Sequence, residues 1–325
     1  MLQTNSIQLS IIIPHYNSEA SLIKLLQTVP AADTIEIIIV DDNSTVILQN
    51  LYTFIENCSF QHIYLYKNTS GKKGAGAGRN IGVSHATGKW LLFADSDDFF
   101  VNDWYRKAEI YMESDWDMVY FCPTSRNMTT GQPASRHVMY KELVENYAES
   151  YSHQAMLELK YCFCTPWSKL IRKEVVDRNR IRFDEVMVSN DIMFMTKCAF
   201  YSKRIKADTN IIYCVTRGGG SLTAGHDRTR FMTRIEVFVN RYTFLRDHLP
   251  EAEFNAIHMN RYALGKLADV IIENWGFSTF FELIRMFRKN HIRIWDAGLL
   301  NPFTLYHKAK IELAWWIDIK RNRRI

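Results

Sequence analysis

The sequence contains no apolar run of the roughly 18 residues that a membrane-spanning helix needs. Its apolar N-terminal stretch is broken at Pro14 and is too short for the core of a secretory signal. Its six cysteines are scattered, and the close pair Cys162 and Cys164 lacks the second pair or the histidine spacing of a zinc site. These absences argue against a membrane-spanning or disulfide-built protein. With 325 residues, of which 47% are hydrophobic and 23% charged, the chain is expected to be globular and to keep free thiols, as in the cytoplasm.

Two phosphate-binding signatures are also missing from the glycine-rich stretch GKKGAGAGRN at residues 71–80. It has no Gly-Lys followed by Ser or Thr, and its glycines are two residues apart instead of forming G-x-G-x-x-G. What remains is a flexible loop that opens a helix, with Arg79 in the first turn. Two interpretations stay open at this point: a plain strand-to-helix connection, or a backbone that comes close to a nucleotide.

The first 100 residues do not carry an excess of positive charge, because they contain six Lys and Arg against nine Asp and Glu. This argues against a nucleic-acid binder, which needs a basic face. The last 25 residues hold six basic and two acidic side chains. Residues 305–325, which include Trp315 and Trp316, have the composition of a segment that lies in the headgroup layer of an anionic membrane. The alternatives are a helix packed on the protein with a solvated basic tail, or an interface in a homo-oligomer.

Short β-branched runs and amphipathic stretches alternate over the first 100 residues, a pattern that predicts a doubly wound, mostly parallel α/β sheet. Strands are expected at residues 9–14, 35–42, 62–68 and 89–95, and helices at 18–29, 46–57 and 79–87. Further strands are expected at 115–123 and 205–216, and a helix at 190–203. From about residue 228 onward the pattern is helical.

Polar residues follow all four expected strands of this first part. Since ligands of open α/β sheets bind outside the carboxyl ends of the strands, these residues are expected to form one site. The strongest signal is DSDD at residues 95–98, because two carboxylates two residues apart can ligate Mg²⁺ or Mn²⁺ while phosphate oxygens complete the coordination. The alternative is a cluster of helix-capping or loop acids.

Together, the segments SIIIPHYN, IEIIIVDDNST and GAGAGRNIGVSHATGKWLLFADSDD resemble family-2 glycosyltransferases of the GT-A fold. The resemblance covers the first 100 residues and continues more weakly through 165–176, 182–194 and 213–223. It implies a GT-A catalytic domain over 1–227, with a nucleotide-binding half (1–100) and an acceptor-binding half (101–227). A helical C-terminal region, 228–325, follows.

The resemblance also implies roles for individual residues. Asp97 is expected to bind the metal directly with Asp95 beside it, and Asp98 to orient its neighbours or touch the sugar. The Tyr16 ring is expected to pack on uracil, with a core aromatic as the alternative, and Asp42 to bind the base, with turn capping as the alternative. The implied nucleotide-binding set is Pro14, Tyr16, Asn17, Asp42, Arg79 and Asp95.

An inverting transfer needs a base that deprotonates the acceptor hydroxyl. The family usually has Glu-Asp before a helix, but this chain has Asn190–Asp191, and asparagine cannot accept the proton. Asp191 is therefore the expected base, with an ordinary helix N-cap as the alternative. On the acceptor side or in a lid, the candidates are Trp167, Lys169 and Arg217, for which a core position or a surface turn stays open.

These expectations describe a metal-dependent inverting glycosyltransferase that uses Mn²⁺ or Mg²⁺. It would move a hexosyl or N-acetylhexosaminyl group from a nucleotide diphosphate donor, most simply a UDP-sugar, to a glycan or glycolipid in surface polysaccharide synthesis. It would act in the cytoplasm or on the inner face of the plasma membrane. The alternatives are a nucleotide-sugar-binding protein with impaired catalysis and, with less support, a nucleotidyltransferase.

Overall fold

A computed structural model describes residues 6–217 and 227–294 of the chain. Contacts divide the chain into two compact units, of which the second begins at Asp227. None of the described helices is both long and apolar enough to span a bilayer. All six cysteines are free, as the sequence predicted.

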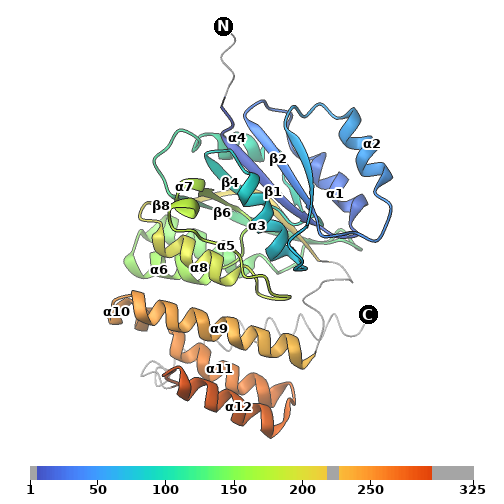
Figure 1. Cartoon of the computed structure of the whole chain (residues 1–325). Helices are drawn as coiled ribbons and strands as arrows, with labels where there is room; N and C mark the ends of the chain where they lie inside the picture. Colours follow the sequence, from blue (N-terminus) through green and yellow to red (C-terminus); the bar gives the residue numbers. More distant parts are fainter. Residues whose placement is uncertain (1–5, 218–226, 295–325) are drawn as a thin grey trace. The chain divides into compact units, whose positions relative to one another are not determined.

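The first unit contains an eight-stranded sheet in the order β3-β2-β1-β4-β7-β6-β8-β5 (Figure 1). Strands β3, β2, β1 and β4 run parallel, as do β6 and β8, whereas β7 and β5 pair antiparallel with their neighbours. The strands are β1 (Leu9–His15), β2 (Ile35–Asp41), β3 (Ile63–Lys67), β4 (Trp90–Phe93), β5 (Phe99–Phe100), β6 (Met118–Asn127), β7 (Lys169–Arg172) and β8 (Ile205–Arg217). Every residue of β1 is buried, which explains its continuous apolar run.

Helices cover both faces of this sheet (Figure 1). Right-handed crossovers place α1 and α2 on one face and α3, whose connection runs back past β1 to β4, on the other. The helices of the first unit are α1 (Glu19–Leu26), α2 (Gln49–Asn57), α3 (Ala75–His85), α4 (Trp104–Glu109), α5 (Val138–Ser150), α6 (His153–Cys162), α7 (Lys173–Arg178) and α8 (Ile192–Tyr201).

The register brings the carboxyl ends of the first strands to one edge. His15 is paired with Asp41, and Asp41 with Lys67, while Ile12 lies beside Phe93 at the end of β4. The segments that follow β1, β2, β3 and β4 therefore emerge together, as the sequence predicted.

The described part of the second unit is helical. It consists of α9 (Arg228–His248), α10 (Glu251–Ala256), α11 (Met259–Ile272) and α12 (Gly276–Lys289). Its core contains Phe238 of α9, whose ring lies 6.1 Å from that of Phe287 in α12. A buried hydrogen bond of 2.5 Å from Tyr242 Oη to Asn260 Oδ1 joins α9 to α11. The segment 305–325, for which membrane contact was expected, lies outside the described residues.

Candidate active site

The glycine-rich stretch is a helix start and not the flexible loop that the sequence suggested. Helix α3 already begins at Ala75, and Gly76 and Gly78 are buried within its first turn. A Cβ on Gly76 would lie 2.2 Å from the carbonyl oxygen of Asp184, and one on Gly78 would lie 3.2 Å from Pro14 Cβ. These glycines therefore let α3 pack closely on β1 and on the segment that leads to α8. No side chain larger than hydrogen fits at Gly76 without movement of the backbone opposite.

Asp42 fixes the loop that precedes α3. Its Oδ1 accepts a hydrogen bond of 2.5 Å from Asn68 Nδ2, and its Oδ2 accepts one of 2.7 Å from the backbone N–H of Gly74. The carboxylate is buried. The turn-capping alternative thus describes a contact that the structure contains, and binding of the nucleotide base by Asp42 stays a prediction.

The residues after β1 differ in what they can reach. The Tyr16 ring is 47% exposed, so it is not a core aromatic and is accessible to a ligand. Asn17 joins two loops, because its Oδ1 accepts from the N–H of Thr45 at 2.8 Å and its Nδ2 donates to Thr45 Oγ1 at 3.0 Å. Pro14 is buried against Gly78. It supports the start of α3, and its expected place in the wall of a base pocket stays a prediction.

Arg79 connects two parts of the candidate site that are far apart in the sequence. Its guanidinium is buried, with Nη2 2.5 Å from Asp95 Oδ1 and Nη1 donating to Asn190 Oδ1 at 2.9 Å. It also lies 5.4 Å from the centre of the Phe183 ring. One side chain thus links the acid turn after β4 to the residue before Asp191.

The three acids of the DSDD turn have different partners. Asp95 is half-buried and uses one oxygen for Arg79. Asp98 is buried, and its two oxygens accept hydrogen bonds from Tyr213 Oη at 2.8 Å and from the Thr216 N–H at 2.6 Å. Asp97 is exposed, and among the described residues no side chain forms a hydrogen bond or ion pair with its carboxylate, although its own backbone N–H and the more distant charge of Arg136 both favour the ionised form. Incomplete hydration and the nearby negative charge of Asp95 both raise the pKa of Asp97.

Tyr213, which the sequence analysis did not single out, holds this turn together. Its buried hydroxyl accepts from the Asp95 N–H at 2.8 Å and donates to Asp98 Oδ2. Thr216 Oγ1 adds a hydrogen bond of 2.6 Å to the Asp97 carbonyl. Tyr213 and Thr216, which we call the β8 clamp, therefore hold the acid turn in place. Asp98 binds both of them, which agrees with the orienting role that was one of its two expected roles. A tyrosine in an apolar strand gives no sequence signal for such a contact.

We expect Tyr213→Phe to weaken both the fold and the site. The substitution leaves Asp98 Oδ2 and the Asp95 N–H without their hydrogen-bond partner, which lowers the free energy of unfolding by about 1–3 kcal/mol. Urea denaturation measures this loss. The matched control is Tyr111→Phe, which removes a similar buried hydrogen bond of 2.7 Å to Asp208 Oδ2. Only the change at Tyr213 should also reduce metal-dependent binding of a nucleotide sugar, and equal donor affinity in the two variants would contradict the clamp.

Asp191 lies directly before α8, yet its side chain makes no capping hydrogen bond. The helix N-cap alternative therefore lacks the contact that defines it. Burial raises the pKa of Asp191 and the charge of Asp95 adds to this effect, whereas Arg79 and Lys169 oppose it. A carboxylate with a raised pKa, which accepts from its own backbone N–H and from no side-chain donor among the described residues, is suited to accept a proton.

Neither the Trp167 nor the Lys169 side chain reaches solvent, which agrees with the core alternative for Trp167, and an acceptor-side role stays a prediction for both. Lys169 Nζ donates to the Thr165 carbonyl at 2.6 Å and lies 3.1 Å from the centre of the Phe163 ring. The ring centres of Trp167 and Tyr213 lie 6.0 Å apart in a stacked arrangement, so Trp167 packs against the tyrosine that holds the acid turn. Arg217 ends β8. The glycine segment of its expected lid, 218–220, lies outside the described residues.

A divalent cation at the acid turn would need oxygen ligands from a bound diphosphate in addition to those of the protein. The residues that the structure describes include no group of three or more His, Cys, Asp or Glu arranged to hold a metal. Asp97 and the second oxygen of Asp95 are available, and hard cations such as Mg²⁺ accept one or two carboxylates together with phosphate oxygens and water. The donor set therefore fits a metal that arrives with a diphosphate.

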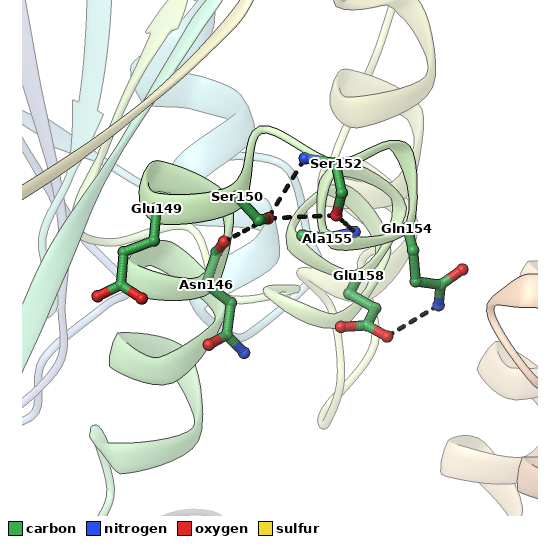
Figure 2. Close-up of a pocket in the computed structure, with 7 residues that line it drawn as sticks. All are labelled: Asn146, Glu149, Ser150, Ser152, Gln154, Ala155 and Glu158. Carbon is green, nitrogen blue, oxygen red and sulfur yellow. Dashed lines mark hydrogen bonds between the residues drawn. The ribbon is translucent and has the colours of Figure 1, made fainter.

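A surface hollow between α5 and α6 shares no residue with this cluster (Figure 2). Its hydroxyl groups are used at helix ends, where Ser150 Oγ donates to the Asn146 carbonyl at 2.7 Å and Ser152 Oγ accepts from the Ala155 N–H at 3.2 Å. The hollow is explained by the junction of the two helices, and we assign it no part in the candidate site.

Comparisons with known proteins agree on one family. The family model described as Glycosyl transferase family 2 matches residues 10–180. A poly(ribitol-phosphate) β-glucosyltransferase of Bacillus spizizenii is 27% identical over 231 residues, which are 67% of this chain and 34% of that protein. The poly(ribitol-phosphate) β-N-acetylglucosaminyltransferase TarS of Staphylococcus aureus is 25% identical over 225 residues, 67% of this chain and 37% of TarS. The chain thus spans about a third of the length of these relatives.

Solved structures show the same fold. TarS residues 1–349 of S. aureus, in complex with UDP-GlcNAc, align with a TM-score of 0.61 and 21% identity, covering 82% of this chain and 81% of that one. The mannosyltransferase PcManGT of Pyrobaculum calidifontis, in complex with GDP-Man and Mn²⁺, aligns with a TM-score of 0.53 and 14% identity. That alignment covers 94% of this chain and 85% of the mannosyltransferase.

Proposed function

Because the chain belongs to glycosyl transferase family 2, we propose that it transfers a sugar from a nucleotide diphosphate donor to a glycan or glycolipid acceptor, with a divalent cation and with inversion at the anomeric carbon. The predicted GT-A fold is confirmed by the structural matches. A UDP-hexose or UDP-N-acetylhexosamine is the donor that we favour, since the structure of TarS was solved with UDP-GlcNAc. The names of two relatives favour a surface polysaccharide as the acceptor.

The observation that carries this proposal is the unequal use of the acids at the strand ends. Both carboxylate oxygens of Asp98 accept hydrogen bonds from β8, and one carboxylate oxygen of Asp95 binds Arg79. In contrast, the carboxylates of Asp97 and Asp191 have no hydrogen-bonded side-chain partner among the described residues. Asp98, the buried acid of the turn, is fully hydrogen-bonded as structural acids are, whereas Asp97 is open to solvent and therefore to a ligand. The two unpaired carboxylates are the ones needed to bind a cation and to accept a proton.

Asp97, with the free oxygen of Asp95, would hold Mn²⁺ or Mg²⁺ against the donor diphosphate. When bound, the cation would neutralise the charge that develops on the leaving diphosphate. The Tyr16 ring is exposed for stacking on the base. The β8 clamp keeps the backbone of the acid turn fixed, so that Asp97 and Asp95 need little reorganisation when the donor binds.

Asp191 would remove the proton from the acceptor hydroxyl as that oxygen attacks the anomeric carbon and the bond to the diphosphate breaks. Its raised pKa makes it a stronger base than an ordinary aspartate. The impaired-catalysis alternative came from Asn190, which cannot serve as a base. Asn190 instead helps to position Arg79. Its amide oxygen accepts a hydrogen bond from Nη1 of Arg79, while Nη2 of the same guanidinium binds Asp95.

We expect Asn190→Glu, which restores the residue usual in the family, to move the acidic limb of the pH profile of kcat/KM upward by about one pH unit. A new negative charge next to Asp191 and a partly neutralised Arg79 both favour the protonated form of Asp191. Activity would therefore be lost at a higher pH as the solution is acidified. The control is Asn57→Glu, which adds the same charge at the exposed end of α2. An unshifted limb in Asn190→Glu would show that Asp191 does not set it.

A thermal-shift screen of nucleotide sugars with and without Mn²⁺ tests the proposed donor class. Stabilisation by at least one nucleoside-diphosphate sugar, larger with Mn²⁺ than with EDTA, is the expected result. No stabilisation by any donor would contradict it. We also propose the cytoplasm as the place of action, consistent with six free cysteines.

A further inference from the structure

The corner between α11 and α12 exposes four large apolar side chains that the proposed function does not use. They are Ile271 (70% exposed), Ile272 (78%), Phe277 (84%) and Phe281 (63%). The two isoleucines end α11 and Phe277 stands at the start of α12, so they lie at the same end of a helical hairpin. Single exposed apolar residues are ordinary, but a group at one corner marks a contact surface.

The outward face of α12 continues this corner with positive charge. Phe277, Phe281, Arg285 and Arg288 are spaced by four, four and three residues, so they form one stripe along the helix, with Lys289 beside its end. All five are exposed. Arg285, Arg288 and Lys289 form no ion pair within the described ranges. The opposite stripe is formed by Thr279, Leu283 and Phe287, which are buried in the unit.

Two other occupants of this surface are disfavoured by charge. In a symmetric pair of chains the patch meets its own copy, so the basic half of the stripe would lie against either the basic half or the apolar half of the copy, and neither half offers a carboxylate to pair with it. The chain's own C-terminal segment, residues 295–325, carries six Lys and Arg against three Asp and Glu, so it would bring further positive charge to a basic face. An occupant that is apolar inside and negative at its surface has neither problem.

We propose that this corner and the α12 stripe bind the surface of an anionic phospholipid membrane. Phe277, Phe281 and the isoleucines would enter the boundary between headgroups and acyl chains, and the three basic residues would contact lipid phosphates. A helix with aromatic and aliphatic residues next to Arg and Lys has the chemistry of an interfacial helix. The inference does not depend on the sugar-transfer proposal, because it uses only the second unit.

Co-sedimentation of the full chain with vesicles tests this proposal. The chain should bind vesicles of equal parts phosphatidylglycerol and phosphatidylcholine, bind pure phosphatidylcholine weakly, and lose binding as salt rises. The double variant Phe277→Ser/Phe281→Ser should bind anionic vesicles about tenfold or more weakly, and Arg288→Glu/Lys289→Glu similarly. Ile110→Ser, which removes an exposed apolar side chain after α4, is the matched control and should bind like the unchanged chain.

Three outcomes would overturn the proposal. One is failure of the unchanged chain to bind anionic vesicles. Another is unchanged binding by both double variants, which would place the membrane contact elsewhere, for example in residues 305–325. A third is a change of oligomeric state in light scattering on Phe277→Ser/Phe281→Ser without a change in vesicle binding, which would assign the surface to a second copy of the chain. Circular dichroism confirms that the variants remain helical.

Discussion

Replacement of Asp191 by asparagine lowers the rate of sugar transfer by about 10²- to 10⁴-fold and leaves donor affinity nearly unchanged. This loss is the usual contribution of a positioned general base. The amide has nearly the same shape as the carboxylate but cannot accept the acceptor's proton. Since the Asp191 side chain makes no capping hydrogen bond, its replacement removes no bond that α8 needs. Transfer rates and donor titrations on the same preparation measure the two effects.

The matched control for this experiment is Asp115→Asn, at an aspartate whose side chain is 91% exposed. It should transfer sugar at the rate of the unchanged chain. Near-normal transfer by Asp191→Asn would remove Asp191 as the base. A parallel loss of donor affinity and transfer would instead place Asp191 on the donor side.

Replacement of Asp97 by alanine abolishes the metal dependence of donor binding and lowers turnover by at least about 100-fold. No side chain among the described residues forms a hydrogen bond or ion pair with the exposed carboxylate of Asp97, so its removal should leave the fold stable and remove mainly a ligand for the cation. Isothermal titration of UDP with and without Mn²⁺ measures the first effect. Asp33→Ala, at an exposed acid before β2, is the control and should bind like the unchanged chain.

The same experiment separates Asp97 from Asp98. Asp98→Ala leaves the Tyr213 O–H and the Thr216 N–H without an acceptor, so it should reduce stability as well as activity. Full activity of either the unchanged chain in excess EDTA or the Asp97→Ala variant would contradict a metal-dependent transfer.

Much of the first unit could be predicted from the sequence because its strands are buried on both faces. Continuous apolar runs, rich in β-branched residues in β1 and β2, indicated the strands β1, β2 and β4, and the parallel order then placed their polar ends at one edge. The start of α3 was predicted too late. Glycines usually weaken helices, and the reason for Gly76 is the backbone at Asp184, more than 100 residues away, which a local pattern cannot reveal.

The acid turn shows the same limit at the level of chemistry. The sequence identified DSDD as the central feature, but it could not say which acid is free. That difference is made by Tyr213 and Thr216 from β8 and by Arg79 from α3. The burial of Trp167 and Lys169 could not be predicted for a related reason, because aromatic and basic side chains suit both a sugar site and a buried aromatic cluster, and only packing distinguishes the two.

The measurement that tests the central claim most directly is release of nucleoside diphosphate from a panel of nucleotide sugars by the full chain in the presence of Mn²⁺. The account predicts release from at least one donor, its loss in EDTA and in Asp97→Ala, and its retention in Asp33→Ala. Absence of release from every donor, together with absence of donor binding, or release that is equal in EDTA and in Asp97→Ala, would contradict it.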